Sequence, residues 1–397
     1  MINLSPPLQQ KLQMLEMLAS SGLSTYGLTV SSGCGPTMMV EGRECINFIS
    51  NSYLGFSMHP QVIEAACQAA RKYGIGIGGS PLACGTTELH LRLAEIIART
   101  YGKQEALVFA TGYQALTGML SGLLTGKDLA LVDNLDHRSI IDGCKLAGCR
   151  IRSFVHNNSE DLRRLVESTS SHQGHRLLIV DSVYSMDGDI APLPEINDIC
   201  RPAGVTVCID EAHSLGILGR SGKGLLEHFD LPDGADVVAG TFSKFAGAVG
   251  GFCAADSQVI ELLRMQASPF VFSASLPPAI VAAVTTSFEL LEREPHWRRQ
   301  LWDNVHFVLE GLHEMGYDTG ASRTPVIPVM IRDTEKVLRM NRALLDEGVY
   351  ASAVVHPGVP LRQERIRLGV MASHTREQLT RALEAFQRVG RRFDVIS

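Results

Sequence analysis

The chain has 397 residues, of which 45% are hydrophobic and 20% charged, and its formal net charge is −6. This is the composition of a globular protein large enough for more than one domain, and it gives no basic footprint for a nucleic-acid partner. No apolar run approaches about 18 residues, and no basic segment precedes an apolar one at the N-terminus, so we expect a cytoplasmic protein without a stable membrane anchor. The nine cysteines are scattered and include no CxxC pair, which argues against a disulfide framework or a metal site.

Residues 1–46 are interpreted as an N-terminal arm, with a helical stretch, LQQKLQMLEML, before the glycine-rich SSGCGP. From residue 47 to residue 292, short apolar runs alternate with helical patterns. This alternation predicts a large α/β domain with a mostly parallel central sheet and helices on both faces. Strands covered on both faces are continuous apolar runs, and we expect them at 106–110, 129–132, 152–155, 177–180, 205–209 and 236–240.

Residues 293–397 are expected to form a smaller C-terminal α+β domain. A helical pattern opens at EPHWRRQ, and a second helix is expected around 338–347. The segments PVIPVMI, VYASAVV and ERIRLGV have strand patterns, and a closing helix follows Ser373.

The segment GIGIGG, at 74–79, formally satisfies the dinucleotide fingerprint GxGxxG. That fingerprint binds a nicotinamide cofactor only when a strand precedes it and a helix begins on it. The preceding segment, HPQVIEAACQAARKY, has apolar residues at helical spacing instead. We therefore interpret Gly74 as the C-cap of a helix.

Polar side chains follow the expected strands of the large domain, where ligands of parallel α/β sheets bind. Thr111 and Gly112 follow the first run and lead into a helix whose free N–H groups suit a phosphate. The later runs are followed by His137, by Ser185, by Asp210 with His213, and by Thr241, Ser243 and Lys244. Phosphate donors, an acid, two histidines and a lysine are thus expected at one edge of the sheet.

These side chains match the needs of pyridoxal phosphate. A lysine amine must react with its aldehyde, and the small apolar neighbours of Lys244 in GTFSKFAGAVGG favour the neutral, nucleophilic amine. A carboxylate must keep the pyridine nitrogen protonated, and Asp210 at the end of a buried strand is well placed to do so. A histidine on the ring and another at the ring oxygen would orient the cofactor.

Nine segments in chain order extend this pattern: NSYLGF, GTTELH, FATGYQA, LDHRSIIDG, VDSVYSMDGDIAPL, CIDEAHSLGILG, GTFSKFAGAVGG, FVFSASLPPA and RIRLGVMASHT. They resemble the α-oxoamine synthase family of fold-type-I pyridoxal phosphate enzymes, over roughly nine tenths of the chain. Within that family, the segments TFSKFAGAVGGFCAAD and SPFVFSASLPPAIVAA are most similar to bacterial serine palmitoyltransferases. One departure is Pro81 in GGSPLACGT, where many members carry an arginine, so contacts with substrate or CoA are not transferred from them.

The resemblance implies a role for each matching residue. Lys244 is the Schiff-base lysine, Asp210 faces the pyridine nitrogen, and His137 stacks on the ring. His213 and Ser185 bond the ring oxygen, and Arg367, the second arginine of RIR, binds the substrate carboxylate near Asn51. Gly112, Tyr113 and Thr241 lie at the phosphate, which Ser273 reaches from the other subunit, so a homodimer with a shared site is expected.

The resemblance implies that an amino acid and an acyl-CoA condense with loss of CoA and CO2 to an α-amino ketone. Serine is the favoured amino acid, with alanine or glycine as alternatives, and the acyl chain stays open because no motif marks its pocket. Two other classes of function are open. One is a different pyridoxal phosphate enzyme, such as an aminotransferase or a threonine-cleaving aldolase. The other is a cofactor-free partner subunit, but such a subunit would have lost the lysine that Lys244 provides here.

Overall fold

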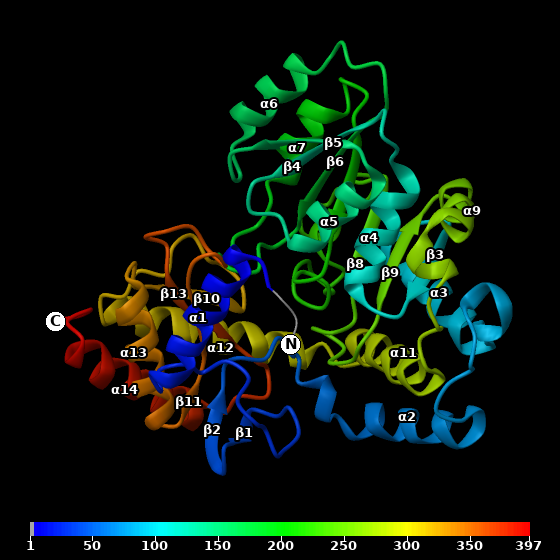
Figure 1. Ribbon diagram of the computed structural model, residues 1–397. Coiled ribbons are helices and arrows are strands. Elements are labelled where there is room, and N and C mark those ends of the chain that lie inside the picture. The colour runs from blue at the N-terminus through cyan, green and yellow to red at the C-terminus, as the bar shows by residue number, and fades with distance from the viewer. Residues whose placement is uncertain (1–3) are drawn as a thin grey trace.

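A computed structural model of the chain describes residues 4–397 (Figure 1). Its largest element is a sheet of seven strands: β3 Glu105–Phe109, β4 Leu129–Asp133, β5 Arg150–Phe154, β6 Arg176–Asp181, β7 Thr206–Asp210, β8 Val237–Thr241 and β9 Gly251–Ala255. The six strands predicted from apolar runs are all present, with bounds that agree to within two residues. The prediction of an α/β fold with a central sheet is confirmed.

The strand order of this sheet is β3-β9-β8-β7-β6-β4-β5. Strands β5, β4, β6, β7 and β8 pair in parallel, whereas β9 is antiparallel to both of its neighbours, β8 and β3. The sheet is therefore mostly parallel, as expected. Sequence patterns did not predict β9, because its segment, GFCAA, consists largely of small residues that do not mark a strand.

Helices cover both faces of the central sheet, and alternate residues of each strand supply the two cores. In β4, Leu129 and Leu131 belong to one buried cluster, and Ala130 and Val132 belong to the other. The first face packs against α3 Glu88–Tyr101, α6 Ser159–Ser168, α7 Leu193–Cys200 and α11 Pro278–Arg293. The second packs against α4 Gly112–Leu123, α5 Arg138–Ala147, α9 Ser257–Gln266 and α10 Ser268–Val271. This burial on both faces is the reason why the strands read as continuous apolar runs.

The C-terminal part is a smaller α+β unit, seen on the left of Figure 1. Its antiparallel sheet has the order β10-β13-β12, formed by Val326–Met330, Arg365–Gly369 and Ser352–Val354. Its helices are α12 His296–Glu314, α13 Thr334–Asp346 and α14 Arg376–Arg392. The expected boundary between residues 292 and 293 falls at the last turn of α11.

Residues of the expected N-terminal arm take part in the C-terminal unit. The arm contains α1 Pro6–Ser20, β1 Thr37–Val40 and β2 Arg43–Asn47. Strand β2 pairs in parallel with β11 Val349–Tyr350, in a second small sheet of order β1-β2-β11. We therefore propose that residues 37–47 belong with the C-terminal domain. Of the predicted N-terminal arm, the part that contains α1 remains a prediction.

The glycine segment at 74–79 follows a helix and not a strand. Helix α2, Pro60–Tyr73, ends at Gly74, which has φ 81° and closes the helix as predicted. The segment leads into η2, a single π-helical turn at Pro81–Gly85. The remaining short elements are η1 Phe56–Met58 and α8 Leu225–His228. Across residues 4–397, none of the helices has the length and apolar character that a membrane span requires.

Candidate active site

A cavity of about 220 Å³ lies at the carboxyl ends of the parallel strands. Its walls come from segments that directly follow β3, β4, β7 and β8. Of the eleven residues predicted from sequence, six line it: Gly112, Tyr113, His137, Asp210, Thr241 and Lys244. The structure thus brings residues from four separate segments to the wall of one cavity.

Lys244 and Asp210 both line this cavity, and the charge of each affects the pKa of the other. Burial lowers the pKa of the Lys244 amine below its usual value, and the nearby Asp210 carboxylate only partly opposes that shift. Burial also raises the pKa of Asp210, while Lys244 and His137 act to lower it. Asp210 Oδ1 accepts a hydrogen bond from the Ala212 N–H at 2.9 Å, which fixes its orientation. The site therefore holds a lysine prone to lose its proton beside a buried, oriented carboxylate.

The N-terminus of α4 forms a narrow cradle against the end of β8. A Cβ atom at Gly112 would come within 2.5 Å of the Thr241 Cβ, so only glycine fits there. Thr111 caps the helix by accepting from the Gln114 N–H at 3.1 Å, and the first N–H groups of the helix have no partner within it. The Thr241 hydroxyl donates to the Gly250 carbonyl at 2.9 Å and lies 2.9 Å from the Ser243 hydroxyl. Backbone N–H groups and hydroxyls thus converge where a phosphate would bind.

Two residues that were predicted to bind the phosphate, Tyr113 and Ser273, bond to other side chains in the structure. The Tyr113 hydroxyl points to Asp142 on α5 and donates to it at 2.8 Å, and the residue is half exposed. The Ser273 hydroxyl accepts from the Gln114 side chain of the same chain at 3.0 Å. Gln114 lies in the first turn of α4, so Ser273 is near this chain's own cradle. Its predicted contact with the partner's cofactor remains a prediction.

His137 caps the N-terminus of α5 at the rim of the cavity. Its Nδ1 accepts from the Ser139 backbone N–H at 3.3 Å and lies 2.7 Å from the Ser139 hydroxyl. Its own N–H donates to Asp181 Oδ2 at 3.2 Å. Desolvation lowers the pKa of His137, which favours the neutral ring suited to stacking on an aromatic cofactor. Sequence patterns did not single out Asp181, although it ends β6 directly opposite Asp210 in the sheet register.

His213, Asn51 and Arg367 do not line the small cavity but are joined by one hydrogen-bond network. Arg367 Nη2 donates to Asn51 Oδ1 at 2.9 Å, and the same oxygen accepts from the Tyr53 hydroxyl at 3.2 Å. The Tyr53 hydroxyl lies 2.7 Å from His213 Nδ1. Burial, and then the positive charges of Lys244 and Arg367, hold the pKa of His213 well below its usual value, so this ring is neutral. Tyr53 was missed as a site residue, although it lies within the motif NSYLGF.

Arg365 and Arg367 of β13 have different partners: the first forms an ion pair, and the second bonds only to uncharged groups among the described residues. Arg365 is fully buried and forms an ion pair with Asp187 at 2.6 Å. Arg367 is 5% exposed and donates from Nε to the Ser185 carbonyl at 2.5 Å. Among the residues the structure describes, no carboxylate forms an ion pair with Arg367. A buried guanidinium without a counter-charge is suited to binding a substrate carboxylate. Ser185 contributes its carbonyl here, and its predicted hydroxyl contact with the cofactor remains a prediction.

The donor set fits pyridoxal phosphate. A desolvated amine, a buried carboxylate on the adjacent strand and a helix N-terminus against Thr241 satisfy the aldehyde, the pyridine nitrogen and the phosphate in turn. Together with the mostly parallel seven-stranded sheet and the small C-terminal domain, this site defines a fold-type-I pyridoxal phosphate enzyme.

Comparison with known proteins narrows that class. Residues 43–386 match the family model for aminotransferase class I and II. The 8-amino-7-oxononanoate synthase of Thermoanaerobacter pseudethanolicus is 38% identical over 96% of this chain and 97% of its own. The serine palmitoyltransferase of Sphingobacterium spiritivorum is also 38% identical, over 96% of each chain. The chain belongs to the aminotransferase class I and II family, and within it to the α-oxoamine synthases, which are pyridoxal phosphate-dependent acyltransferases.

Solved structures agree with this placement. The serine palmitoyltransferase of Sphingomonas wittichii superposes with a TM-score of 0.95 at 34% identity, and the match covers all of both chains. A second structure, described as SPT with PLP internal aldimine, has the same TM-score, identity and coverage. The expected fold, family and cofactor are thus confirmed.

Proposed function

We propose that this protein condenses an amino acid, serine in the first place, with an acyl-CoA thioester, and releases CoA, CO2 and an α-amino ketone. The observation that carries the proposal is the meeting of Lys244 and Asp210 at one small cavity, with the unpaired Arg367 nearby. The first two residues suit the cofactor, and the third suits an amino-acid carboxylate. The similarity to a synthase named for an amino-oxo acid and to a transferase named for serine and a palmitoyl group supports the condensation.

Each residue then has a defined task. When bound, pyridoxal phosphate withdraws electrons from the substrate α-carbon, so that this carbon can lose a proton and attack a thioester. Lys244 holds the cofactor and, as a free amine, takes that proton. Asp210 keeps a proton on the pyridine nitrogen, and the Gly112 and Thr241 cradle binds the phosphate. Neutral His137 would cover one face of the ring, and neutral His213 would bond its oxygen.

Arg367 orients the substrate. Its planar guanidinium can bind a carboxylate with two parallel hydrogen bonds, and Asn51 and the Ser185 carbonyl hold it in place from two sides. This contact places the bonds of the α-carbon relative to the ring and the lysine, so the carboxylate is held until CO2 leaves. The C-terminal domain therefore supplies the substrate contact, while the large domain supplies the cofactor contacts.

We further propose that the enzyme is a homodimer in the cytoplasm. Two large apolar side chains are almost fully exposed in the single chain, Ile75 at 84% and Phe272 at 83%, and Phe272 lies next to Ser273, which bonds to Gln114 at the phosphate cradle. Exposed apolar side chains beside a functional site favour a protein partner. Phe272 precedes Ser273, so a partner that covers it would also lie near the phosphate cradle. A cytoplasmic location suits both proposed substrates.

The proposal is tested with the purified enzyme carrying its cofactor. Serine, alanine, glycine and threonine are titrated while the visible absorbance of the cofactor is recorded, and thiol release is then measured with acyl-CoAs of graded length. A spectral change with serine and CoA release from a 16-carbon thioester would establish a serine palmitoyltransferase activity. A preference for alanine or glycine and a shorter thioester would retain the reaction but change the substrates.

The other class of function predicts a different result. A pyridoxal phosphate aminotransferase or aldolase converts its amino acid without any thioester. Rapid turnover of an amino acid in the absence of acyl-CoA, without CoA release when it is added, would therefore overturn the condensation proposal.

A further inference from the structure

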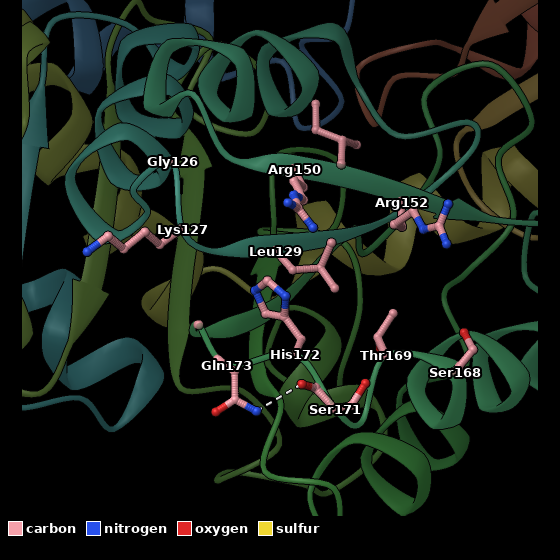
Figure 2. Close-up of a pocket in the computed structure, with 12 residues that line it drawn as sticks. Gly126, Lys127, Leu129, Arg150, Arg152, Ser168, Thr169, Ser171, His172 and Gln173 are labelled. Atoms are coloured by element: carbon pink, nitrogen blue, oxygen red, sulfur yellow. Dashed lines mark hydrogen bonds between the residues drawn. The ribbon is translucent and has the colours of Figure 1, made fainter.

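A second, larger cavity lies at the opposite edge of the central sheet, next to the amino ends of β4 and β5 (Figure 2). Its volume is about 1070 Å³. The first residue of β4, Leu129, and the first three of edge strand β5, Arg150–Arg152, form one wall. The end of α6 and the loop 171–174 form the other wall. Because β4 and β6 run the full depth of the sheet, this cavity is about 16 Å from the active-site edge.

The charged side chains in its lining are all basic. Lys127, Arg150 and Arg152 line the cavity with His172, and no carboxylate belongs to the described lining. Arg150 and Arg152 are two positions apart in one strand, so they project from the same face, about 7 Å apart. In Figure 2 Arg150 is drawn above His172, while the side chains of Lys127 and Arg152 extend outward to opposite sides. Three basic residues thus line one cavity in a protein whose net charge is −6.

None of these cations has an internal counter-charge. Between residues 4 and 397, no ion pair involves Lys127, Arg150 or Arg152. The nearest acid in sequence, Asp128, is buried and forms no ion pair with them; its carboxylate accepts from the backbone N–H groups of Thr125 and His175 and from the Thr125 hydroxyl. The two arginines are exposed, so solvent screens part of their mutual repulsion, and among the described residues no ion pair offsets the rest.

The end of α6 does not account for the arginines either. Its last carbonyl groups would attract cations, but those of residues 165–167 are already bonded. Arg176 donates to the Val166 carbonyl, and the Thr169 hydroxyl donates to the Leu165 and Val166 carbonyls. The charge of Arg150 and Arg152 is thus left for something outside the chain.

The opposite wall is rigid and carries an unused ring nitrogen. His172 N–H donates to the Thr169 carbonyl at 3.0 Å, and the His175 carbonyl accepts from the Leu129 N–H at 2.9 Å. A Cβ atom at Gly174 would overlap the Lys127 carbonyl and come 2.9 Å from His172 Nε2, so the loop is closely packed. His172 Nε2 is buried but has no hydrogen-bond partner within the described residues. A buried polar atom without a partner is costly unless a ligand or water satisfies it.

From these observations we infer that this basic cavity, formed by Lys127, Arg150–Arg152 and residues 168–174, binds a soluble phosphorylated small molecule. Two arginine forks on one strand face suit the oxygens of a phosphate ester or a diphosphate. The hydroxyl of Ser171 would add a hydrogen bond, and the volume leaves room for an organic group beyond the phosphates. The basic cavity shares no lining residue with the cofactor cavity, so a ligand can bind here while the cofactor is bound.

The inference is tested by calorimetric titration of the enzyme, with its cofactor bound, using inorganic pyrophosphate and ADP as probes. We expect saturable binding of one equivalent per chain and a weakening of about tenfold or more in the double variant R150S/R152S, because each lost guanidinium removes a charge-assisted hydrogen bond. The matched control is R163S/R164S on the outer surface of α6, which removes the same charge. The control should bind as the parent does.

Other results would overturn the inference. Equal weakening in both double variants would show a general effect of surface charge. Absence of binding by the parent at millimolar probe, or aggregation of R150S/R152S with unchanged binding, would show that the arginines only protect an exposed edge strand. The variant R150K/R152K, which keeps the charge but removes the planar forks, gives a second reading: it should weaken pyrophosphate binding by a few-fold if the guanidinium groups contact the probe.

Discussion

The two edges of the central sheet differ in where their cavity-lining residues lie in the sequence. At the carboxyl edge, each strand is followed within a few residues by a polar side chain of specific chemistry, and the parallel order of the strands gathers these side chains around one cavity. At the amino edge, the basic cavity uses two arginines inside an edge strand and a loop between α6 and β6. No local motif marks it.

This difference separates a site that sequence patterns can predict from one that they cannot. Ligands of parallel α/β sheets bind beyond the carboxyl ends of the strands, so the residues that follow each apolar run can be grouped from the sequence alone. No corresponding rule points to the amino ends. A site there becomes visible only when charges, hydrogen bonds and cavity shape are considered together.

Among the variants that test this comparison, Lys244→Ala should have the largest effect on turnover. Loss of this amine removes both the covalent hold on the cofactor and the proton acceptor, so turnover should fall by about a thousandfold or more. The visible absorbance of the bound cofactor should also change its position. Steady-state thiol release and absorption spectra measure both effects. Lys145→Ala, at an exposed lysine of α5, is the control and should behave as the parent. Comparable activity in K244A would show that the carboxyl edge is not organised around this lysine.

Arg367→Ala tests whether the C-terminal domain completes the carboxyl edge. Loss of the guanidinium should raise the KM for the amino acid by roughly tenfold to a hundredfold, as expected for the loss of charge-assisted hydrogen bonds, while the KM for acyl-CoA changes little. The comparison variant is Arg43→Ala, at an exposed arginine whose one ion pair among the described residues is with Asp346, at 3.8 Å. If R367A raised both KM values alike, the residue would be a structural support of the domain interface and not a carboxylate contact.

Much of this edge was predictable, and the exceptions share a physical cause. Apolar runs located β4, β6, β7 and β8 because burial on both faces dictates their composition. The pairing of β2 with β11 joins residues about 300 positions apart, and no local pattern encodes such a contact. Tyr53 is similar: its role depends on His213, 160 positions away. Asp181 lies within the motif VDSVYSMDGDIAPL, but its importance follows only from the register that places it beside Asp210.

A polar cluster near the same edge shows that location alone does not define function. His156 lies between Asp133 and Asp189, with nitrogen to oxygen distances of 3.0 and 2.8 Å, and the two carboxylates raise its pKa to about 10 against the opposing effect of burial. Because the folded-state pKa lies above the unfolded value of about 6.5, its stabilisation is complete below pH 6.5 and is lost as the pH rises through 10.

Denaturant unfolding between pH 6 and pH 10 tests this assignment. The parent should lose free energy of unfolding over that range at up to about 1 kcal/mol per pH unit, and His156→Gln should be less stable at pH 6 with a flatter dependence. The matched control is His228→Gln, at a histidine without an ion pair among the described residues, which should keep the parent slope. An unchanged slope in H156Q would mean that the ring is neutral in the folded protein.

The smallest expected effect is that of Tyr53→Phe, which tests whether the Tyr53 hydroxyl positions His213 or contacts the amino-acid substrate. Tyr53→Phe keeps the buried ring but removes the hydroxyl that lies between Asn51 and His213, so two polar groups each lose one neutral partner. The cost of one such bond is about 1 kcal/mol, which corresponds to a several-fold loss in kcat/KM. Since Tyr53 does not line the cofactor cavity, the loss should appear as a shift in the pH profile and the cofactor spectrum through His213, and serine binding should be weakened only slightly. A variant with an unchanged spectrum but weaker serine binding would instead place the hydroxyl in direct contact with the amino acid, and the polar network would then belong to the substrate and not to the ring.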